Sequence, residues 1–215
     1  MRLRVHDLLR VAKPAGIHFD DPAPPWVQKR LTAAPWVVAR RTPAMSGWLA
    51  AGLRGKLRSE RCAIWVHESA IAETIAPEDL VEAGLSAHGL RRRALPAIAL
   101  LPAVATIMRD HAAGVLWGPT GSVGIELASG EPWVTDSSDL DVMIRARAPL
   151  ARSLARTLHA CLSRLKPRVD LLIEAPLGGI ALADWATDGP CLIRSHFGRR
   201  LVTDPWAHVG GADIS

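Results

Sequence analysis

The chain has 215 residues, of which 49% are hydrophobic and 22% charged, so it can bury a core and lacks the composition of a disordered protein. Its formal net charge of +5 comes from the first half, since residues 1–94 carry 15 Lys/Arg and 9 Asp/Glu whereas residues 95–215 carry 11 and 12. Most of this excess is Arg, which can hold a phosphate or a carboxylate with two hydrogen bonds. We therefore expect an anionic partner and no nucleic acid.

No segment predicts a signal peptide or a membrane span. Residues 1–16 scatter charge among apolar residues. The longest apolar stretch, residues 94–108, is too short to cross a bilayer and contains two prolines, so we expect a buried helix there. The protein is expected to be cytoplasmic, with no membrane partner. Three widely spaced cysteines without metal-ligand spacing are expected to be reduced core thiols: Cys62, Cys161 and Cys191.

Prolines divide the first third of the chain into short apolar runs. A helix is expected to begin at residues 77–79, Pro-Glu-Asp, because proline is favoured in the first turn and acidic side chains near the positive end of the helix dipole. Periodicity is lost over residues 83–93, so we expect an N-terminal domain of residues 1–85 and a C-terminal domain of residues 86–215. Three runs suit β-strands: Trp36 to Ala39, Trp48 to Leu53 and Ala63 to His67.

The second part of the chain alternates helical and strand patterns. The expected fold class is α+β: a small mixed sheet with helices in the C-terminal domain, preceded by a smaller strand-rich α+β N-terminal domain. The expected elements are a helix over Leu100 to Met108, a strand over Val115 to Trp117, a helix over Ser122 to Ala128, a strand over Leu140 to Ile144, a helix over Leu150 to Leu165 and a strand over Val169 to Ile173.

A glycine-rich turn lies between the first strand and the short helix of this domain. Gly118, Gly121 and Gly124 let the backbone approach a ligand closely, and Ser122 opens a helix whose free N–H groups favour a phosphate. No lysine follows in the order that a P-loop requires. A dinucleotide-binding turn stays open as an alternative, because an acid, Asp141, follows about twenty residues later.

Two aspartates distinguish these alternatives. Strand alternation puts Asp139 and Asp141 on one face while Leu140, Val142 and Ile144 point to the core. Carboxylates so close repel each other unless a cation lies between them, which favours Mg²⁺, and Asp170 on the next strand could join them. The alternative is a solvated turn whose aspartates cap a strand. The glycine turn upstream and Asp170 downstream favour phosphoryl or nucleotidyl transfer.

These residues also carry a resemblance to known families. Gly121-Ser122, the Asp139-x-Asp141 pair and Asp170 resemble the nucleotidyltransferase fold of the polymerase-beta type. The longer string GPTGSVGIELASG…SDLD, with APWVVARR and PEDL upstream, resembles the phosphoribosyl-dephospho-CoA transferases along the whole chain. That likeness implies an enzyme that attaches 2′-(5″-triphosphoribosyl)-3′-dephospho-CoA to a serine of the acyl carrier protein of malonate decarboxylase, with release of diphosphate.

The resemblance also implies roles for single residues. Asp139 and Asp141 match the family's aspartate pair, which implies Mg²⁺ ligands and catalytic residues. Asp170 matches the third acid of the superfamily by element order alone. Gly121 and Ser122 match the turn that contacts phosphate, so the attacking serine belongs to the carrier protein. Ser122 and Asp139 are 17 positions apart, longer than is usual in the superfamily, and we expect residues 130–135 to form a loop over the site.

Other residues are weaker candidates. Gly118 is expected beside the substrate, and Arg145 and Arg147 could reach its triphosphate or lie at a solvated strand end. Glu126 could support packing, and Trp117 and Trp133 could stack on adenine or fill the core. Basic residues that could dock an acidic carrier or a polyphosphate, or form solvated faces, are Arg40, Arg41, Arg54, Lys56, Arg58, Arg61, Arg91, Arg92 and Arg93.

Two other functions stay open from the sequence. The chain could be a nucleotidyltransferase that uses ATP or another nucleoside triphosphate on a small molecule. It could also be a non-catalytic module that binds a nucleotide or a carrier protein. Only the family likeness separates the malonate decarboxylase carrier from that of citrate lyase.

Overall fold

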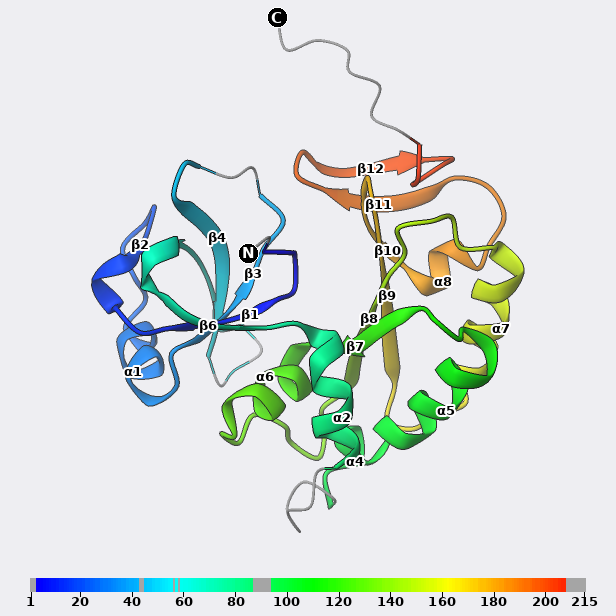
Figure 1. Ribbon diagram of the computed structural model, residues 1–215, viewed down its shortest axis with the longest axis horizontal. Coiled ribbons are helices and arrows are strands. Elements are labelled where there is room, and N and C mark those ends of the chain that lie inside the picture. Colours follow the sequence, from blue (N-terminus) through cyan, green and yellow to red (C-terminus); the bar gives the residue numbers. More distant parts are fainter. Residues whose placement is uncertain (1–2, 43–44, 56, 58, 87–93, 208–215) are drawn as a thin grey trace, which may run out of the picture.

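The computed structural model describes residues 3–42, 45–55, 57, 59–86 and 94–207, which form two six-stranded sheets and their helices. Figure 1 shows the two sheets beside each other, with helix α1 (Trp26–Ala33) on the outer side of the first sheet and α5 (Leu101–His111), α7 (Arg152–Leu162) and α8 (Leu182–Trp185) beside the second. The α+β prediction is confirmed. The likeness to the nucleotidyltransferase fold stays a prediction.

The N-terminal sheet is antiparallel, with the strand order β2-β5-β4-β3-β1-β6. Three of its strands were expected from the sequence, with shifts of one or two residues at some ends. Short 3₁₀ turns separate β1 from β2, η1 (Pro14–Gly16), and β5 from β6, η2 (Glu68–Ala70), while a third, η3 (Pro77–Asp79), leads from β6 into helix α2. The six strands are β1 (Leu8–Val11), β2 (Ile17–His18), β3 (Trp36–Ala39), β4 (Trp48–Arg54), β5 (Arg61–His67) and β6 (Ile71–Ile75).

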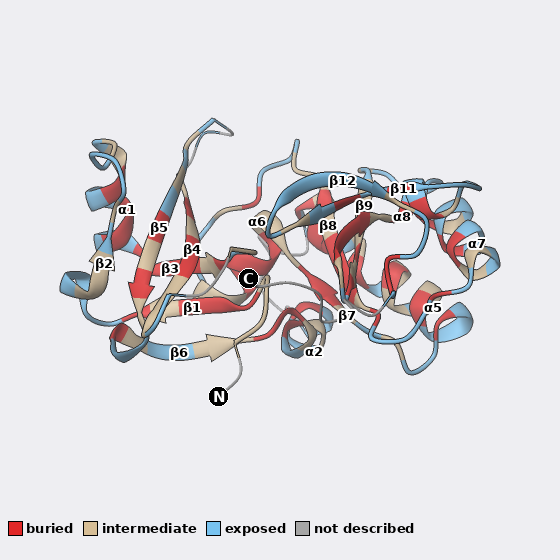
Figure 2. Cartoon of the chain, turned by 90° about the horizontal axis from the view of Figure 1, so that it is seen from above, coloured by how far each residue is buried: buried red, intermediate tan, exposed pale blue. Residues whose placement is uncertain are grey.

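The two faces of the N-terminal sheet have different partners, because successive side chains of a strand point to opposite sides. Leu9, Val37 and Leu53 lie on the face that packs with Val27 and Leu31 of α1 and forms the core of this half. On the opposite face, Leu8 and Trp36 join the core of the C-terminal half. Figure 2 shows buried residues on the strands of both sheets.

The C-terminal sheet is mixed, with the order β12-β11-β10-β9-β8-β7. Strands β8 and β9 are parallel, and all other neighbours in this sheet are antiparallel. The edge strand β12 is exposed along most of its length (Figure 2). The six strands are β7 (Leu116–Pro119), β8 (Leu140–Arg145), β9 (Val169–Ala175), β10 (Gly178–Ala181), β11 (Cys191–Ser195) and β12 (Gly198–Val202).

The helices of this half differ from the expectation over residues 94–108, and α8 was not expected. The stretch expected as a single helix over residues 94–108 is two helices, α4 (Pro96–Ala99) and α5, which meet at Leu100. Pro102 lies in the first turn of α5, where a missing N–H is tolerated, and a new helix therefore starts there. The remaining helices are α2 (Leu80–Leu85) and α6 (Gly121–Ser129).

Two smaller expectations can also be compared with the structure. No helix in the described ranges is both long and apolar enough to span a bilayer. All three cysteines are free thiols, as expected, but only Cys191 is buried, whereas Cys62 and Cys161 are partly exposed.

Candidate functional site

A cavity of about 1010 Å³ lies between the two sheets and has walls from both halves of the chain. The N-terminal half contributes residues of β3, β4 and β5, and the C-terminal half contributes the start of α6 and residues of β8 and β9. Its described lining holds two carboxylates, Asp141 and Asp170. The six Lys and Arg residues of that lining are Arg40, Arg54, Arg61, Lys166, Arg168 and Arg194.

The parallel pairing of β8 and β9 brings the predicted aspartates together. Asp141 and Asp170 are register partners on these two strands, and Asp139 directly precedes β8. The alternation expected in β8 is present, since Leu140 and Ile144 are fully buried in the core while Asp141 faces the cavity. Asp139 is not part of the described cavity lining, although its charge acts on Asp141.

The glycine turn is pressed directly against Asp141. Gly121 has a φ of +61°, a conformation that L side chains rarely adopt, and a methyl group at its Cα would lie 2.1 Å from Oδ2 of Asp141. The N–H of Thr120 donates a hydrogen bond of 2.8 Å to the carbonyl oxygen of Asp141. The beginning of α6 and the aspartate strand are therefore held in one fixed arrangement.

The electrostatic environment of Asp141 suits a cation. Burial raises the pKa of this carboxyl above its ordinary value, and the neighbouring charges of Asp170 and Asp139 add to the rise, while Arg54 and Arg61 oppose it. Asp170 accepts a hydrogen bond of 2.6 Å from Nε of Arg168 and keeps 42% of its side chain exposed.

The carboxylates meet the chemical requirements of a Mg²⁺ site only in part. Within the described ranges, no group of three or more His, Cys, Asp or Glu side chains is arranged to hold a metal ion. Mg²⁺ is commonly held by one or two carboxylates together with substrate phosphates, and the Asp139 and Asp141 pair fits that pattern. We therefore regard these two residues as the candidate ligands, while Asp170 is engaged by Arg168.

Two of the candidates near the glycine turn are placed differently from the expectation. Gly118 packs against the backbone of Pro77. A methyl group on Gly118 would lie 2.0 Å from the Pro77 carbonyl oxygen, so only a glycine permits this contact between β7 and η3. Ser122 is partly buried and is not among the residues that line the cavity. The part of α6 that reaches the cavity consists of Gly121 and Ile125, preceded by Thr120.

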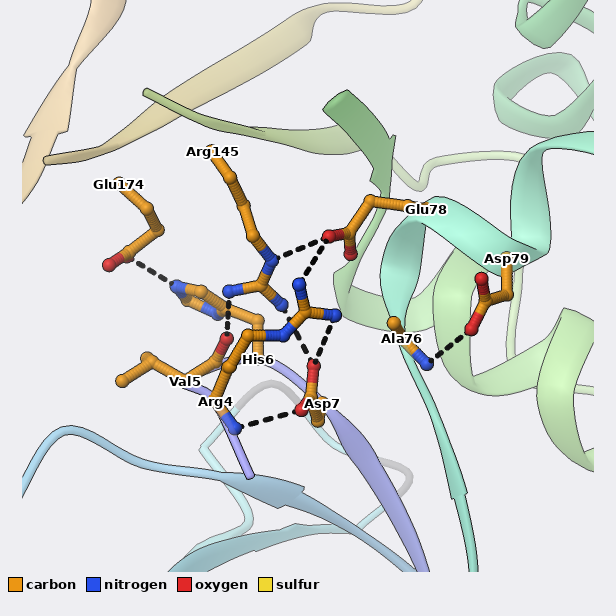
Figure 3. Close-up of polar contacts among 9 residues, drawn as sticks. All are labelled: Arg4, Val5, His6, Asp7, Ala76, Glu78, Asp79, Arg145 and Glu174. Atoms are coloured by element: carbon orange, nitrogen blue, oxygen red, sulfur yellow. Dashed lines mark hydrogen bonds and ion pairs between the residues drawn. The ribbon is translucent and has the colours of Figure 1, made fainter. Parts of the chain in front are cut away.

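Arg145 does not lie at the cavity but in an ion-pair network between the two sheets (Figure 3). Its guanidinium donates hydrogen bonds to Glu78 at 2.7 Å, to Asp7 at 2.8 Å and to the carbonyl oxygen of Val5 at 3.1 Å. Only 9% of the side chain is exposed. All three nitrogen atoms of the guanidinium donate hydrogen bonds within the protein. The predicted contact of Arg145 with the substrate is therefore wrong, and this residue joins the two halves of the chain instead.

A second contact joins the sheets beside this network. Glu174 accepts hydrogen bonds from His6 at 2.8 Å and from Arg41 (Figure 3 shows the His6 contact). Burial acts to raise the pKa of the Glu174 carboxyl, but the contacts with His6 and Arg41 outweigh it and hold the pKa below its ordinary value. His6 has a φ of 72° and lines the cavity, so this contact positions part of the wall.

Glu126 fixes the loop that was expected over the site. Its side chain is 1% exposed, and Oε2 accepts hydrogen bonds of 2.7 Å from the N–H groups of Trp133 and Val134. The ring of Trp133 is covered by the guanidinium of Arg30, 3.7 Å from the ring centroid. Trp117 packs against the core, so neither tryptophan presents itself as an adenine platform.

The sequence did not identify several basic cavity residues as site residues, namely Lys166, Arg168 and Arg194 in the C-terminal half and three arginines in the N-terminal half. Arg40, Arg54 and Arg61 were expected only as docking residues, yet they face the aspartates across the cavity. The signal available in the sequence was their charge, without any indication of the face on which it lies. The other basic docking candidates Lys56, Arg58, Arg91, Arg92 and Arg93 lie outside the described residues.

Comparison with known proteins gives one consistent family. Residues 85–205 match the family model described as the C-terminal domain of phosphoribosyl-dephospho-CoA transferase MdcG, and residues 4–77 match the model of its N-terminal domain. No solved structure matches the chain significantly.

Several curated relatives carry the same description, phosphoribosyl-dephospho-CoA transferase. The relative from Azotobacter vinelandii is 41% identical over 193 residues, which is 89% of each chain. A relative from Pseudomonas putida strain W619 is 38% identical over 202 residues, or 94% of each chain. A relative from Klebsiella pneumoniae strain 342 is 36% identical over 206 residues, which is 94% of this chain and 96% of the relative.

Proposed function

The chain belongs to the phosphoribosyl-dephospho-CoA transferase family, and on that premise we propose that it transfers 2′-(5″-triphosphoribosyl)-3′-dephospho-CoA to a serine of the malonate decarboxylase acyl carrier protein. The product is the holo carrier protein, and diphosphate is released. The proposal includes a cytoplasmic location, as expected for an enzyme whose substrate derives from coenzyme A.

The reaction is a phosphoryl-group transfer in which one bond replaces another. The serine oxygen of the carrier forms a bond to the phosphorus attached to the ribose, and the bond from that phosphorus to the bridging oxygen breaks. The electron pair of the broken bond leaves with diphosphate. The serine proton passes to a carboxylate of the site, for which we assign Asp170 because it lies beside Asp141 and is partly exposed.

The observation that supports this proposal best is the contact between the glycine turn and Asp141. Gly121 reaches the carboxylate more closely than any residue with a side chain could, and both residues line a cavity large enough for a CoA-type substrate. Thr120 and Gly121, at the start of α6, line the same cavity as Asp141, and the free N–H groups of a helix start favour a phosphate. This supports a site in which phosphate and cation would bind side by side.

Mg²⁺ is part of the proposal. Asp139 and Asp141 would hold it together with phosphate oxygens of the substrate, and it would offset negative charge on the phosphates and on these carboxylates. Without it, the excess of basic side chains in the cavity lining still favours a polyphosphate.

The test is mass spectrometry of the carrier subunit after incubation with the enzyme, the triphosphoribosyl precursor and Mg²⁺. We expect a mass increase equal to the precursor without diphosphate. Asp141→Asn is expected to lower the rate by about a thousandfold or more, because a required negative charge is lost. Asp136→Asn is the matched control, since Asp136 is exposed and lies outside the cavity lining.

Two results would contradict the proposal. An unmodified carrier in the presence of the folded enzyme and all reactants would show that the chain is not the transferase for this carrier. Incorporation of label from ATP into a small molecule without any carrier would indicate the alternative nucleotidyltransferase activity instead.

A further inference from the structure

We propose that Arg40, which directly follows β3, together with Arg54 of β4 and Arg61 of β5, forms the binding site for the two outer phosphates of the substrate, those that leave as diphosphate. The identity of this ligand rests on the proposed function, whereas the presence of a polyphosphate site follows from the residues themselves. The N-terminal half would then be one wall of the active site as well as a surface for partners.

The first argument is the pairing of two like charges. Arg54 of β4 and Arg61 of β5 are direct register partners in the antiparallel sheet. Two guanidinium groups placed side by side in this way can both donate to one shared phosphate oxygen.

The second argument is the shape of the surface around this pair. Gly52 and Ala63 are register partners two residues along the same strands, so they lie on the same face of the sheet as Arg54 and Arg61. Because neither has a large side chain, they leave space between the arginines. Arg40 of the neighbouring region lies across Gly52, since a methyl group on that glycine would be 3.2 Å from Cδ of Arg40. In this part of the cavity wall, three arginines therefore surround a patch of two small residues, Gly52 and Ala63.

The third argument is the charge balance across the cavity. The described part of the wall from the N-terminal half contains Arg40, Arg54 and Arg61, together with His6, and no carboxylate. The opposite wall carries Asp141 and Asp170 together with Lys166, Arg168 and Arg194, and Arg168 pairs with Asp170. The wall from the N-terminal half is therefore the one with basic groups and no carboxylate, and its Arg54 and Arg61 lie close enough to act electrostatically on Asp141. A polyphosphate between the walls would have its reacting phosphorus near the aspartates and its outer phosphates near the arginines.

This arrangement has a consequence for the reaction. As the bond from the reacting phosphorus to the bridging oxygen breaks, negative charge increases on the leaving diphosphate. Guanidinium groups placed beside it stabilise that charge in the transition state. The same arginines would contact a diphosphate in any ligand, and the dephospho-CoA part of the substrate also contains one, so a test must separate the two.

The test measures binding by isothermal titration calorimetry to the full chain, with no carrier present. The probes are inorganic tripolyphosphate, which represents the reactive end, and dephospho-CoA, which contains only the internal diphosphate. Arg54→Gln and Arg61→Gln are each expected to lower the affinity for tripolyphosphate about tenfold and to leave dephospho-CoA binding unchanged. Arg10→Gln is the control, because Arg10 belongs to the same sheet and lies outside the cavity lining.

Each outcome separates this inference from the proposed function. Unchanged tripolyphosphate binding by both variants would overturn the inference, even if the wild-type enzyme modifies the carrier. Weakened dephospho-CoA binding with unchanged tripolyphosphate binding would overturn it too, because the arginines would then hold the internal diphosphate. Loss of tripolyphosphate binding in the two variants, with an intact Arg10→Gln control, supports the site even if no carrier is modified.

Discussion

Gly121 and Asp141 are in closer contact than side-chain packing normally permits. The space occupied by a Cβ atom in other residues is taken here by a carboxylate oxygen, at 2.1 Å from the position of that atom. The glycine is needed twice, once for its φ of +61° and once for this contact. Sequence spacing predicted the two residues as parts of one site, but it could not show that they touch.

A Gly121→Ala substitution separates these two requirements. We expect carrier modification to fall at least about a hundredfold, because the new methyl group displaces the Asp141 carboxylate, while backbone strain costs about 1 kcal/mol of the free energy of unfolding. Gly189→Ala is the matched control, since Gly189 has a φ of +88° and no atom within 4 Å of the added carbon. Equal rates in the two variants would show that the contact has no functional importance.

At the scale of elements, α6 is joined to the following loop by a buried carboxylate. Glu126 accepts hydrogen bonds from the N–H groups of Trp133 and Val134. The loop over residues 130–135 was expected from its length alone. Its attachment was not, because an acid in a helical pattern does not reveal which backbone groups it will meet after folding.

Glu126→Gln tests this attachment. The amide keeps the volume but replaces a charged acceptor by a weaker neutral one, so we expect a loss of about 2 kcal/mol in the free energy of unfolding. Hydrogen exchange at the amides of Trp133 and Val134 should accelerate, which mass spectrometry of the corresponding peptide measures. Glu131→Gln is the control in the same loop, because Glu131 is exposed. Unchanged exchange in Glu126→Gln would contradict the anchoring role.

Local sequence patterns predicted some strands of this fold and missed others. Strands β3, β4, β5 and β8 were predicted because apolar and β-branched residues alternate there or follow each other in short runs. The hairpin of β11 and β12 was not, because its strand Gly198–Val202 is almost entirely exposed and has no apolar face to reveal it. Its pairing with β11 depends on backbone hydrogen bonds at the edge of an existing sheet.

At the scale of the whole molecule, the two sheets meet through charged groups as well as through apolar packing. Arg145 and Glu174, which are register partners on β8 and β9, contact residues of the N-terminal half. The sequence placed the positive charge in one half and the aspartates in the other. It could not place them opposite each other, because that arrangement depends on how two separately formed sheets pack.

The contact of Glu174 with His6 and Arg41 makes the free energy of unfolding depend on pH. Because its pKa in the folded protein lies below the ordinary value of 4.5, the ionised carboxyl contributes stability above that pH, and this contribution is lost as the pH falls through the lower pKa. Glu174→Gln is therefore expected to lower the free energy of unfolding by about 2 kcal/mol at pH 7 and by progressively less below about pH 4.5.

Urea unfolding of both proteins over this pH range measures the difference. Glu73→Gln is the control, since Glu73 pairs with Arg10 at the surface and its loss should cost less than about 1 kcal/mol at any pH. A difference between wild type and Glu174→Gln that stays constant down to the most acidic pH would contradict the assignment.

The two walls of the cavity belong to halves that each have a hydrophobic core of their own. A molecule that touches both walls therefore stabilises the packing of the two halves against each other. Since a ligand stabilises only the state that binds it, its presence should raise the temperature of unfolding. The substrate would in this sense complete the tertiary structure on which its own conversion depends.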